Sequence, residues 1–168
     1  MFPAHPELIA MIVDWYVTTL IKTPGRAQAF KDSPAIPPEV SILETMDQLG
    51  GAAKIEMKLH DARQRDAKAT MFSEALANVM GYEHLLAGDT RGAVEILKLN
   101  AVAYPNSANA HDSLADAYLA DGQRDLARQN AKKAIDLLAS DTTDPEPRRK
   151  AIRDNAEQKL KQLAGERP

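Results

Sequence analysis

Two stretches of the chain, 74–107 and 108–141, have equal length and carry matching residues at several positions 34 residues apart. A fixed period of about 34 residues is typical of stacked helical hairpins, in which each unit buries its apolar side against the next. Each unit therefore predicts a helix, a turn containing Gly, and a second helix. The matched pairs are Met80 with Leu114, Gly81 with Ala115, Leu85 with Leu119, Gly88 with Gly122, and Ala93 with Ala127.

The residues between the expected helices suit helix ends. Gly accepts the left-handed backbone conformation that ends a helix, and the two matched glycines stand where the first helix of each unit should stop. Asp89 or Thr90 can then cap the second helix of the first unit, and Asn106 or Ser107 can cap the helix that follows. Pro105 separates the two units, because proline disfavours a helical conformation in the residue before it.

These residues together resemble the tetratricopeptide repeat family. The family pattern is met by Gly81, Gly88, Ala93 and Pro105 in the first unit, and by Ala115, Tyr118, Gly122, Ala127 and Ala134 in the second. His84 stands where the first unit should have an aromatic residue, and Ala77 and His111 stand where each unit should have Trp. The resemblance implies an all-α fold in which helical hairpins form a short right-handed superhelix.

The first helix of each tetratricopeptide repeat lines a concave groove, so the resemblance also implies a set of binding positions. They are Asn78, Tyr82 and Leu85 in the first unit, and Asn109, Asp112 and Asp116 in the second. Asp112 and Asp116 are four residues apart and share one helix face, where they would favour Lys or Arg on a ligand. Two other interpretations stay open. The two carboxylates serve only to solvate the face, or the apolar N-terminal helix of this chain fills the groove.

The flanks supply further helices. Residues 38–66 predict an irregular helical pair around Gly50 and Gly51, and residues 145–163 predict a charged cap helix with one apolar stripe. That stripe consists of Ile152, Ala156, Leu160 and Leu163. Residues 23–37 contain three prolines and few apolar residues, and we expect a linker there.

The N-terminal segment, residues 1–22, predicts a helix that is apolar on nearly all sides between Pro6 and Lys22. A helix of this kind must be buried, and burying its ten large apolar side chains is worth about 15 kcal/mol before costs. We expect it to pair in a homodimer, or to exchange onto the partner's repeats, with folding back within the chain as the alternative. The residues expected to carry self-association are Ile12, Trp15, Tyr16 and Leu20.

The run from His5 to Leu8, with that from Met11 to Tyr16, also resembles the last helix of dienelactone-hydrolase-like α/β-hydrolases. This second resemblance implies a relationship to the repeat-bearing tail of such an enzyme, and it makes a small esterase-like hydrolase the alternative function. Such hydrolases carry a nucleophilic Ser in a Gly-x-Ser-x-Gly turn. No Ser of this chain lies in such a turn, so no catalytic residue is predicted.

Composition excludes several other functions. The net charge is −3 and no basic block stands out, so nucleic-acid binding is not expected. The absence of cysteine excludes disulfides and cysteine-ligated zinc, and the four histidines are not spaced as a metal-binding pair, so neither a metal nor a cofactor is predicted. No signal-peptide pattern or membrane-spanning run is present, which favours the cytoplasm, or the periplasm if an upstream part is missing. The prediction is a protein–protein interaction or self-association module that binds a peptide or helix in its groove.

Overall fold

The computed structural model describes residues 38–141 and 144–165, and this part of the chain contains seven helices and no strand. The all-α prediction is confirmed for these residues. The predicted N-terminal helix and linker, and with them Ile12, Trp15, Tyr16 and Leu20, lie outside the described residues. The helices are α3 (Pro38–Met46), α4 (Gly51–Arg65), α5 (Glu74–Leu86), α6 (Thr90–Ala103), α7 (Ala108–Ala120), α8 (Arg124–Leu138) and α9 (Glu146–Gly165).

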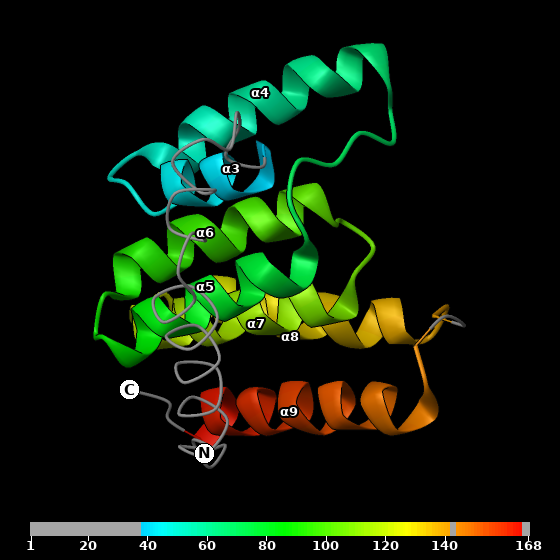
Figure 1. Ribbon diagram of the computed structural model, residues 1–168. Helices are drawn as coiled ribbons and strands as arrows, with labels where there is room; N and C mark the ends of the chain where they lie inside the picture. Colours follow the sequence, from blue (N-terminus) through cyan, green and yellow to red (C-terminus); the bar gives the residue numbers. More distant parts are fainter. Residues whose placement is uncertain (1–37, 142–143, 166–168) are drawn as a thin grey trace, which may run out of the picture. The chain divides into compact units, whose positions relative to one another are not determined.

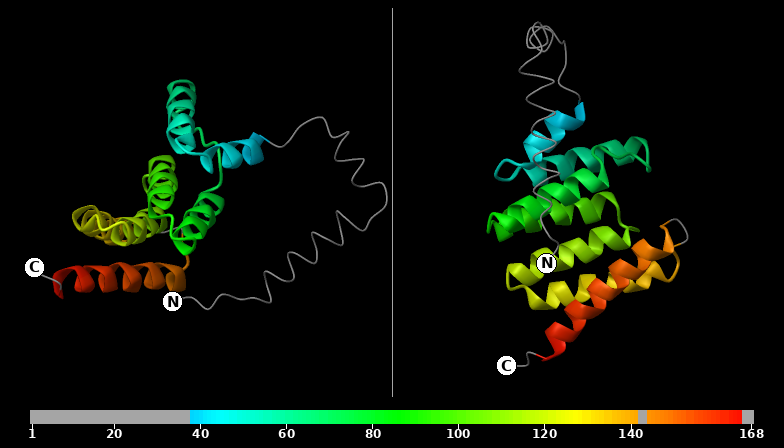
Figure 2. Two further views of the ribbon diagram at one scale, coloured as in Figure 1. Left: turned by 90° about the vertical axis from the view of Figure 1, so that its left-hand side faces the viewer. Right: turned by 60° about the horizontal axis from the view of Figure 1, so that its bottom comes forward.

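The helices α5 and α6 form one hairpin, and α7 and α8 form a second in the same register. Both helices of the second hairpin begin one full repeat period after their counterparts in the first. Gly88 and Gly122 turn the chain between the paired helices at φ values of 81° and 78°. The helix α4 packs on α6 rather than on α5, so Figure 1 shows α6 between α4 and α5, while α9 lies at the opposite end against α8. Figure 2 shows the same helices from two further sides.

Side chains cap two of these helices. The Oδ1 atom of Asp89 accepts a hydrogen bond of 3.0 Å from the Gly92 amide at the start of α6. The Oγ atom of Ser107 accepts one of 3.1 Å from the Ala110 amide at the start of α7. Each bond satisfies one of the amides that a helix N-terminus leaves unpaired. Of the capping residues left open by the sequence, the structure uses Asp89 and Ser107.

Small residues bring the paired helices close together. Ala77, Ala93, Ala115 and Ala127 are fully buried. A Cβ atom on Gly81 would stand 2.4 Å from the Cγ atom of Leu97, so the contact between α5 and α6 requires Gly at this point. The larger members of the core are Ile55, Leu59, Ile96, Leu97, Leu99 and Leu163. An aliphatic core that is rich in Ala therefore holds the hairpins together.

The flanking helices differ from their predicted bounds. The sequence predicts that the first helix of the 38–66 pair extends to Leu49, but α3 ends at Met46, because the chain then turns back through Gly50 at a φ of 69°. Leu49 falls in that turn and is 98% exposed, so it adds nothing to the apolar face of α3. The cap helix α9 packs on α8 and α7, and buries Ile152, Ala156 and Leu163. None of the described helices combines the length and the apolar character needed to cross a membrane.

Candidate functional site

The two carboxylates of the predicted groove face a lysine of the cap helix. The Nζ atom of Lys159 lies 2.8 Å from the Oδ1 atom of Asp112 and 3.0 Å from the Oδ2 atom of Asp116. Lys159 also donates to the backbone carbonyl of Asp112. The side chains of Lys159 and Asp112 are only 8% and 7% exposed, so the basic group expected from a ligand is present within the chain.

Burial raises the pKa of the Asp112 carboxyl to about 6, although the neighbouring Lys159 acts in the opposite direction. A buried carboxylate loses its hydration, which disfavours the charged form. Asp116 lies on the same side of α7, and its charge adds to the rise. Asp112 and Lys159 thus form a buried polar contact between α7 and α9.

Tyr82, on the first helix of the first repeat, also contacts one of this pair of carboxylates. Its hydroxyl donates a hydrogen bond of 2.8 Å to the Oδ2 atom of Asp116, which joins α5 to α7. Burial and the Asp116 charge raise the pKa of the phenol far above its usual value, so Tyr82 keeps its proton. Tyr82 and Asp116 stand one repeat period apart and therefore at the same repeat position. A line of polar contacts runs from Tyr82 through Asp116 to Lys159, across α5, α7 and α9.

The side-chain amides of Asn109 and Asn78, both predicted to line the groove, differ in their hydrogen bonding. Asn109 donates a hydrogen bond of 3.0 Å to the Oε1 atom of Glu74, and Ser107 donates to the same atom. Asn109 therefore connects α7 to the start of α5. The Oδ1 atom of Asn78 is buried, and none of the described residues donates to it. Leu85 is half-buried and packs against the core that α6 and α7 share.

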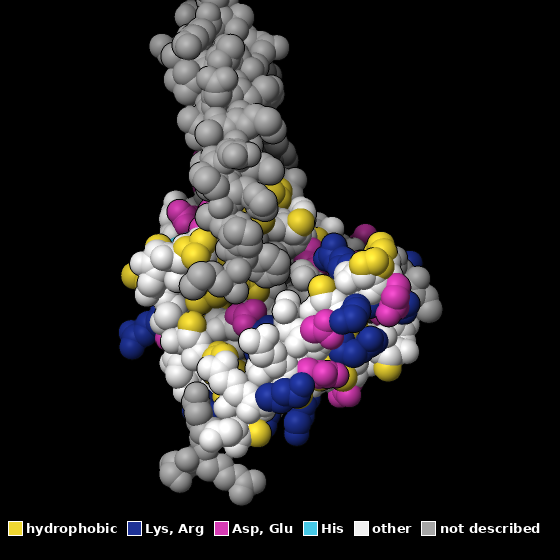
Figure 3. All heavy atoms as spheres, turned by 90° about the horizontal axis from the view of Figure 1, so that it is seen from below, with side chains coloured by type: hydrophobic (Ala, Val, Ile, Leu, Met, Phe, Trp, Pro, Cys, Tyr) yellow, Lys and Arg dark blue, Asp and Glu magenta, His cyan; other side chains and the backbone are white. Residues whose placement is uncertain are grey.

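Three apolar side chains on α5 are exposed and share one face of this helix. Leu76, Val79 and Leu86 are 46%, 55% and 89% exposed, and their spacing keeps them within a quarter-turn of one another. We call these three residues the α5 strip. Figure 3 shows one face of the molecule, on which many Lys, Arg, Asp and Glu side chains gather on one side and hydrophobic side chains are more frequent on the other. Exposed apolar side chains that share one helix face can mark an interaction site.

The sequence analysis missed both Lys159 and the α5 strip as a unit. Lys159 lies on the predicted apolar stripe of the cap helix, three residues after Ala156 and four before Leu163. A lysine at that spacing was a signal for a buried partner. Leu76 and Val79 gave no comparable signal, because α5 is apolar around much of its circumference.

The histidines of the repeats have polar partners within the chain. The ring nitrogens of His84 lie 2.7 Å from Asp89 and 3.0 Å from Asp47, so His84 connects the end of α5 to the turn after α3. Burial lowers the pKa of His84, but the two carboxylates outweigh it and the pKa is raised. His111 contacts Asn130 and the carbonyl of Pro105. Among the described residues, no group of three or more His, Cys, Asp or Glu side chains is arranged to hold a metal ion.

Comparison with known proteins adds no family. No family model matches the sequence, and no curated protein matches it either.

Proposed function

We propose that this chain is a tetratricopeptide-like module that binds an apolar helix along the α5 strip, and that the helix comes from residues 6–22 of a second copy. The observation that carries the proposal is the exposure of Leu76, Val79 and Leu86 on one side of the first repeat. The esterase-like alternative gains no supporting observation among the described residues.

The repeat character rests on geometry that recurs from the first hairpin to the second. Gly88 and Gly122 adopt the same left-handed conformation, and Ala93 and Ala127 are both fully buried. Gly81 and Ala115 are small residues at equivalent positions, where the second helix of the hairpin packs closely. These are the positions that distinguish the tetratricopeptide pattern. They support the superhelical arrangement that the resemblance implies.

The kind of ligand follows from which surface remains open. Asp112 and Asp116 contact Lys159, and Asn109 contacts Glu74, so these polar groups already have partners. The α5 strip presents aliphatic carbon to solvent, although the exposed Glu83 side chain shares this face of α5. Covering a side chain such as Leu86 releases about 25 cal/mol for each Å² of apolar surface removed from water. The strip therefore favours an apolar partner over a basic peptide.

The segment 6–22 has the matching chemistry. Its sequence predicts a helix that is apolar on nearly all sides, and a helix of that kind is stable in water only when it is covered. Two copies of the chain bring two such helices and two α5 strips, and each strip can receive one helix in a symmetric exchange. Each exchanged helix thus covers an α5 strip, and the strip in turn covers part of the apolar surface of that helix.

Sedimentation of the full chain at micromolar concentration tests this proposal. We expect a dimer for the wild type and a monomer for Val79→Glu, because a carboxylate cannot be buried against an apolar helix without a large desolvation cost. Leu126→Glu is the matched control, since Leu126 is an exposed apolar residue of α8, away from the strip. It should remain a dimer. A monomeric wild type, or a dimeric Val79→Glu with an unchanged circular dichroism spectrum, would contradict the proposal.

A further inference from the structure

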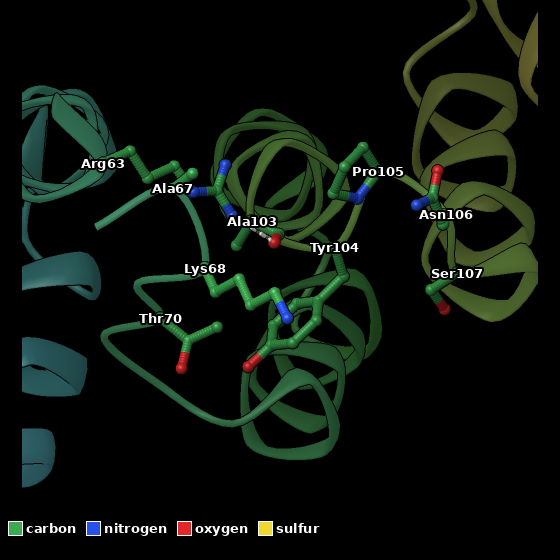
Figure 4. A pocket seen from close by; sticks show the side chains of 9 residues that line it. All are labelled: Arg63, Ala67, Lys68, Thr70, Ala103, Tyr104, Pro105, Asn106 and Ser107. Carbon is green, nitrogen blue, oxygen red and sulfur yellow. Dashed lines mark hydrogen bonds between the residues drawn. The ribbon is translucent and has the colours of Figure 1, made fainter. Parts of the chain in front are cut away.

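An open pocket lies where the connection from α4 to α5 meets the turn between α6 and α7. Its volume is about 420 Å³, which lies within the usual range for sites that bind small molecules. Figure 4 shows its lining, which includes two basic residues and no acidic one. The pocket shares no residue with the α5 strip, so what binds in it is independent of the proposed function.

Arg63 forms a fixed wall of this pocket. Its guanidinium donates hydrogen bonds of 2.9 Å and 2.6 Å to the carbonyls of Val102 and Ala103, and a longer one to the carbonyl of Ala69. Val102 and Ala103 are the last residues of α6, where a helix exposes its unpaired carbonyls and its negative end. Arg63 thus offsets the negative end of α6 at the pocket, and its hydrogen bonds hold it in place. Two carboxylates lie just outside the lining, where Asp66 accepts from the Lys68 amide and Glu74 accepts from Ser107.

Lys68 is the second basic group, and it is exposed. Within the described part of the chain, no carboxylate lies within ion-pair distance of either Arg63 or Lys68. Lys68, Thr70 and Tyr104 all line the pocket, and in the view of Figure 4 the Lys68 side chain extends in the direction of Tyr104. An unpaired ammonium beside a hydroxyl can bind an anion by a charge-assisted hydrogen bond.

The ring of Tyr104 gives the pocket a flat apolar wall. It contacts the ring of Phe72 edge-on with centroids 6.2 Å apart, and its hydroxyl donates to the carbonyl of Phe72. The ring is therefore held both by this ring contact and at its tip. Pro105 adds a second apolar surface to the lining. A planar group can pack here while its charged substituent faces Lys68.

We propose that this pocket binds a small molecule in which a phosphate is attached to a planar ring. Lys68 pairs with the phosphate, the Thr70 hydroxyl donates a hydrogen bond to one of its oxygens, and Tyr104 and Pro105 cover the ring. The positive charge of Arg63, whose side chain is held by its hydrogen bonds, adds to the electrostatic attraction of the phosphate.

Calorimetric titration of the full chain with phenyl phosphate tests the pocket. We expect saturable binding with a Kd of about 1 mM or tighter, and no binding of phenol, which lacks the charge. Lys68→Met should weaken binding at least tenfold, since a partly exposed charge-assisted hydrogen bond is worth about 1.4 kcal/mol. Lys58→Met is the matched control, because Lys58 is an exposed lysine of α4 outside the lining. It should bind like the wild type.

Two results would overturn this inference. One is the absence of saturable binding of phenyl phosphate up to about 10 mM, a concentration at which a 1 mM site is nearly filled. The other is equal binding by Lys68→Met and Lys58→Met, which would place the ligand elsewhere. Neither result depends on whether the chain dimerises through the α5 strip.

Discussion

The two repeats share their helix starts and their turn glycines, but they differ in what packs around them. In the second repeat, α9 packs over α7, and Lys159 occupies the two carboxylates of that helix. In the first repeat, the strip formed by Leu76, Val79 and Leu86 stays exposed on α5. A stacked repeat buries one side against its neighbour, so a repeat without a full neighbour exposes that side. The second repeat is therefore covered by its own cap helix, whereas the first keeps an exposed apolar strip, to which we assign the proposed partner.

Polar residues at equivalent repeat positions also differ in the partners that they have. Tyr82 and Asp116 stand at one repeat position, and each bonds to a helix that follows it in the stack. Asn78 and Asp112 stand at another. Asp112 has Lys159 as its partner, while the Oδ1 atom of Asn78 has none among the described residues. At this repeat position, the second repeat therefore has a buried ion pair, and the first has a buried amide oxygen to which none of the described residues donates.

The largest expected effect comes from removing the closure of the second repeat. Lys159→Met leaves Asp112 buried without its cation, which costs about 3 kcal/mol of unfolding free energy at pH 7. Urea denaturation measures this loss. Lys150→Met on the same helix is the matched control, because Lys150 and Asp154 form an exposed ion pair worth under about 0.5 kcal/mol. Equal losses in the two variants would mean that Lys159 does not close the repeat.

The second repeat should also lose stability as the pH rises from 4 to 6. The pKa of Asp112 is raised from 3.8 to about 6 in the folded chain, so the folded state holds a proton that the unfolded state has released. This contribution is complete below pH 3.8 and is lost as the pH passes 6. It amounts to on the order of 2 kcal/mol.

Denaturant midpoints measured across that range, for the wild type and for Asp112→Asn, isolate the Asp112 contribution. The variant keeps the shape of the side chain and cannot titrate, so its profile should be flatter between pH 4 and 6. An equally steep fall in the variant would assign the change to other groups.

Replacing the turn glycine should destabilise the two repeats equally, because both glycines adopt the same backbone conformation. Gly88→Ala and Gly122→Ala each force a side chain into the left-handed region and should each cost about 1 kcal/mol. A Cβ atom would meet no other atom within 4 Å at either site, so the cost is conformational. Gly165→Ala, at the end of α9, should change stability by under about 0.5 kcal/mol. A large difference between the two turn variants in thermal unfolding would mean that the repeats are not equivalent there.

The smallest effect is expected in the first repeat, at His84. The pKa of this half-buried side chain is raised above 6.5, because its bonds to Asp89 and Asp47 outweigh the effect of burial. Its contribution is present below pH 6.5 and is lost as the pH rises through the raised value. His84→Gln should therefore remove a small fall in thermal midpoint above pH 6.5. A wild type that is insensitive to pH in this range would contradict this assignment.

Most of the described fold was predictable because it depends on local chemistry. The repeat period, the turn glycines and the capping residues act over a few positions, and their helices form where the sequence places them. The groove was harder, because tertiary packing decides which side chains meet. Lys159 is 47 residues from Asp112, and no local pattern joins them. The exposure of the α5 strip likewise depends on what packs beside α5.

Chemical cross-linking between two copies tests the central claim most directly. The chain has no cysteine, so an introduced cysteine is unique. A Val79→Cys chain mixed with a Leu20→Cys chain should form a mixed disulfide under mild oxidation, because the account places residues 6–22 of one copy on the α5 strip of the other. A Leu126→Cys chain mixed with the same partner should form none. Mixed disulfides from Leu126→Cys as readily as from Val79→Cys, or from neither, would contradict the account.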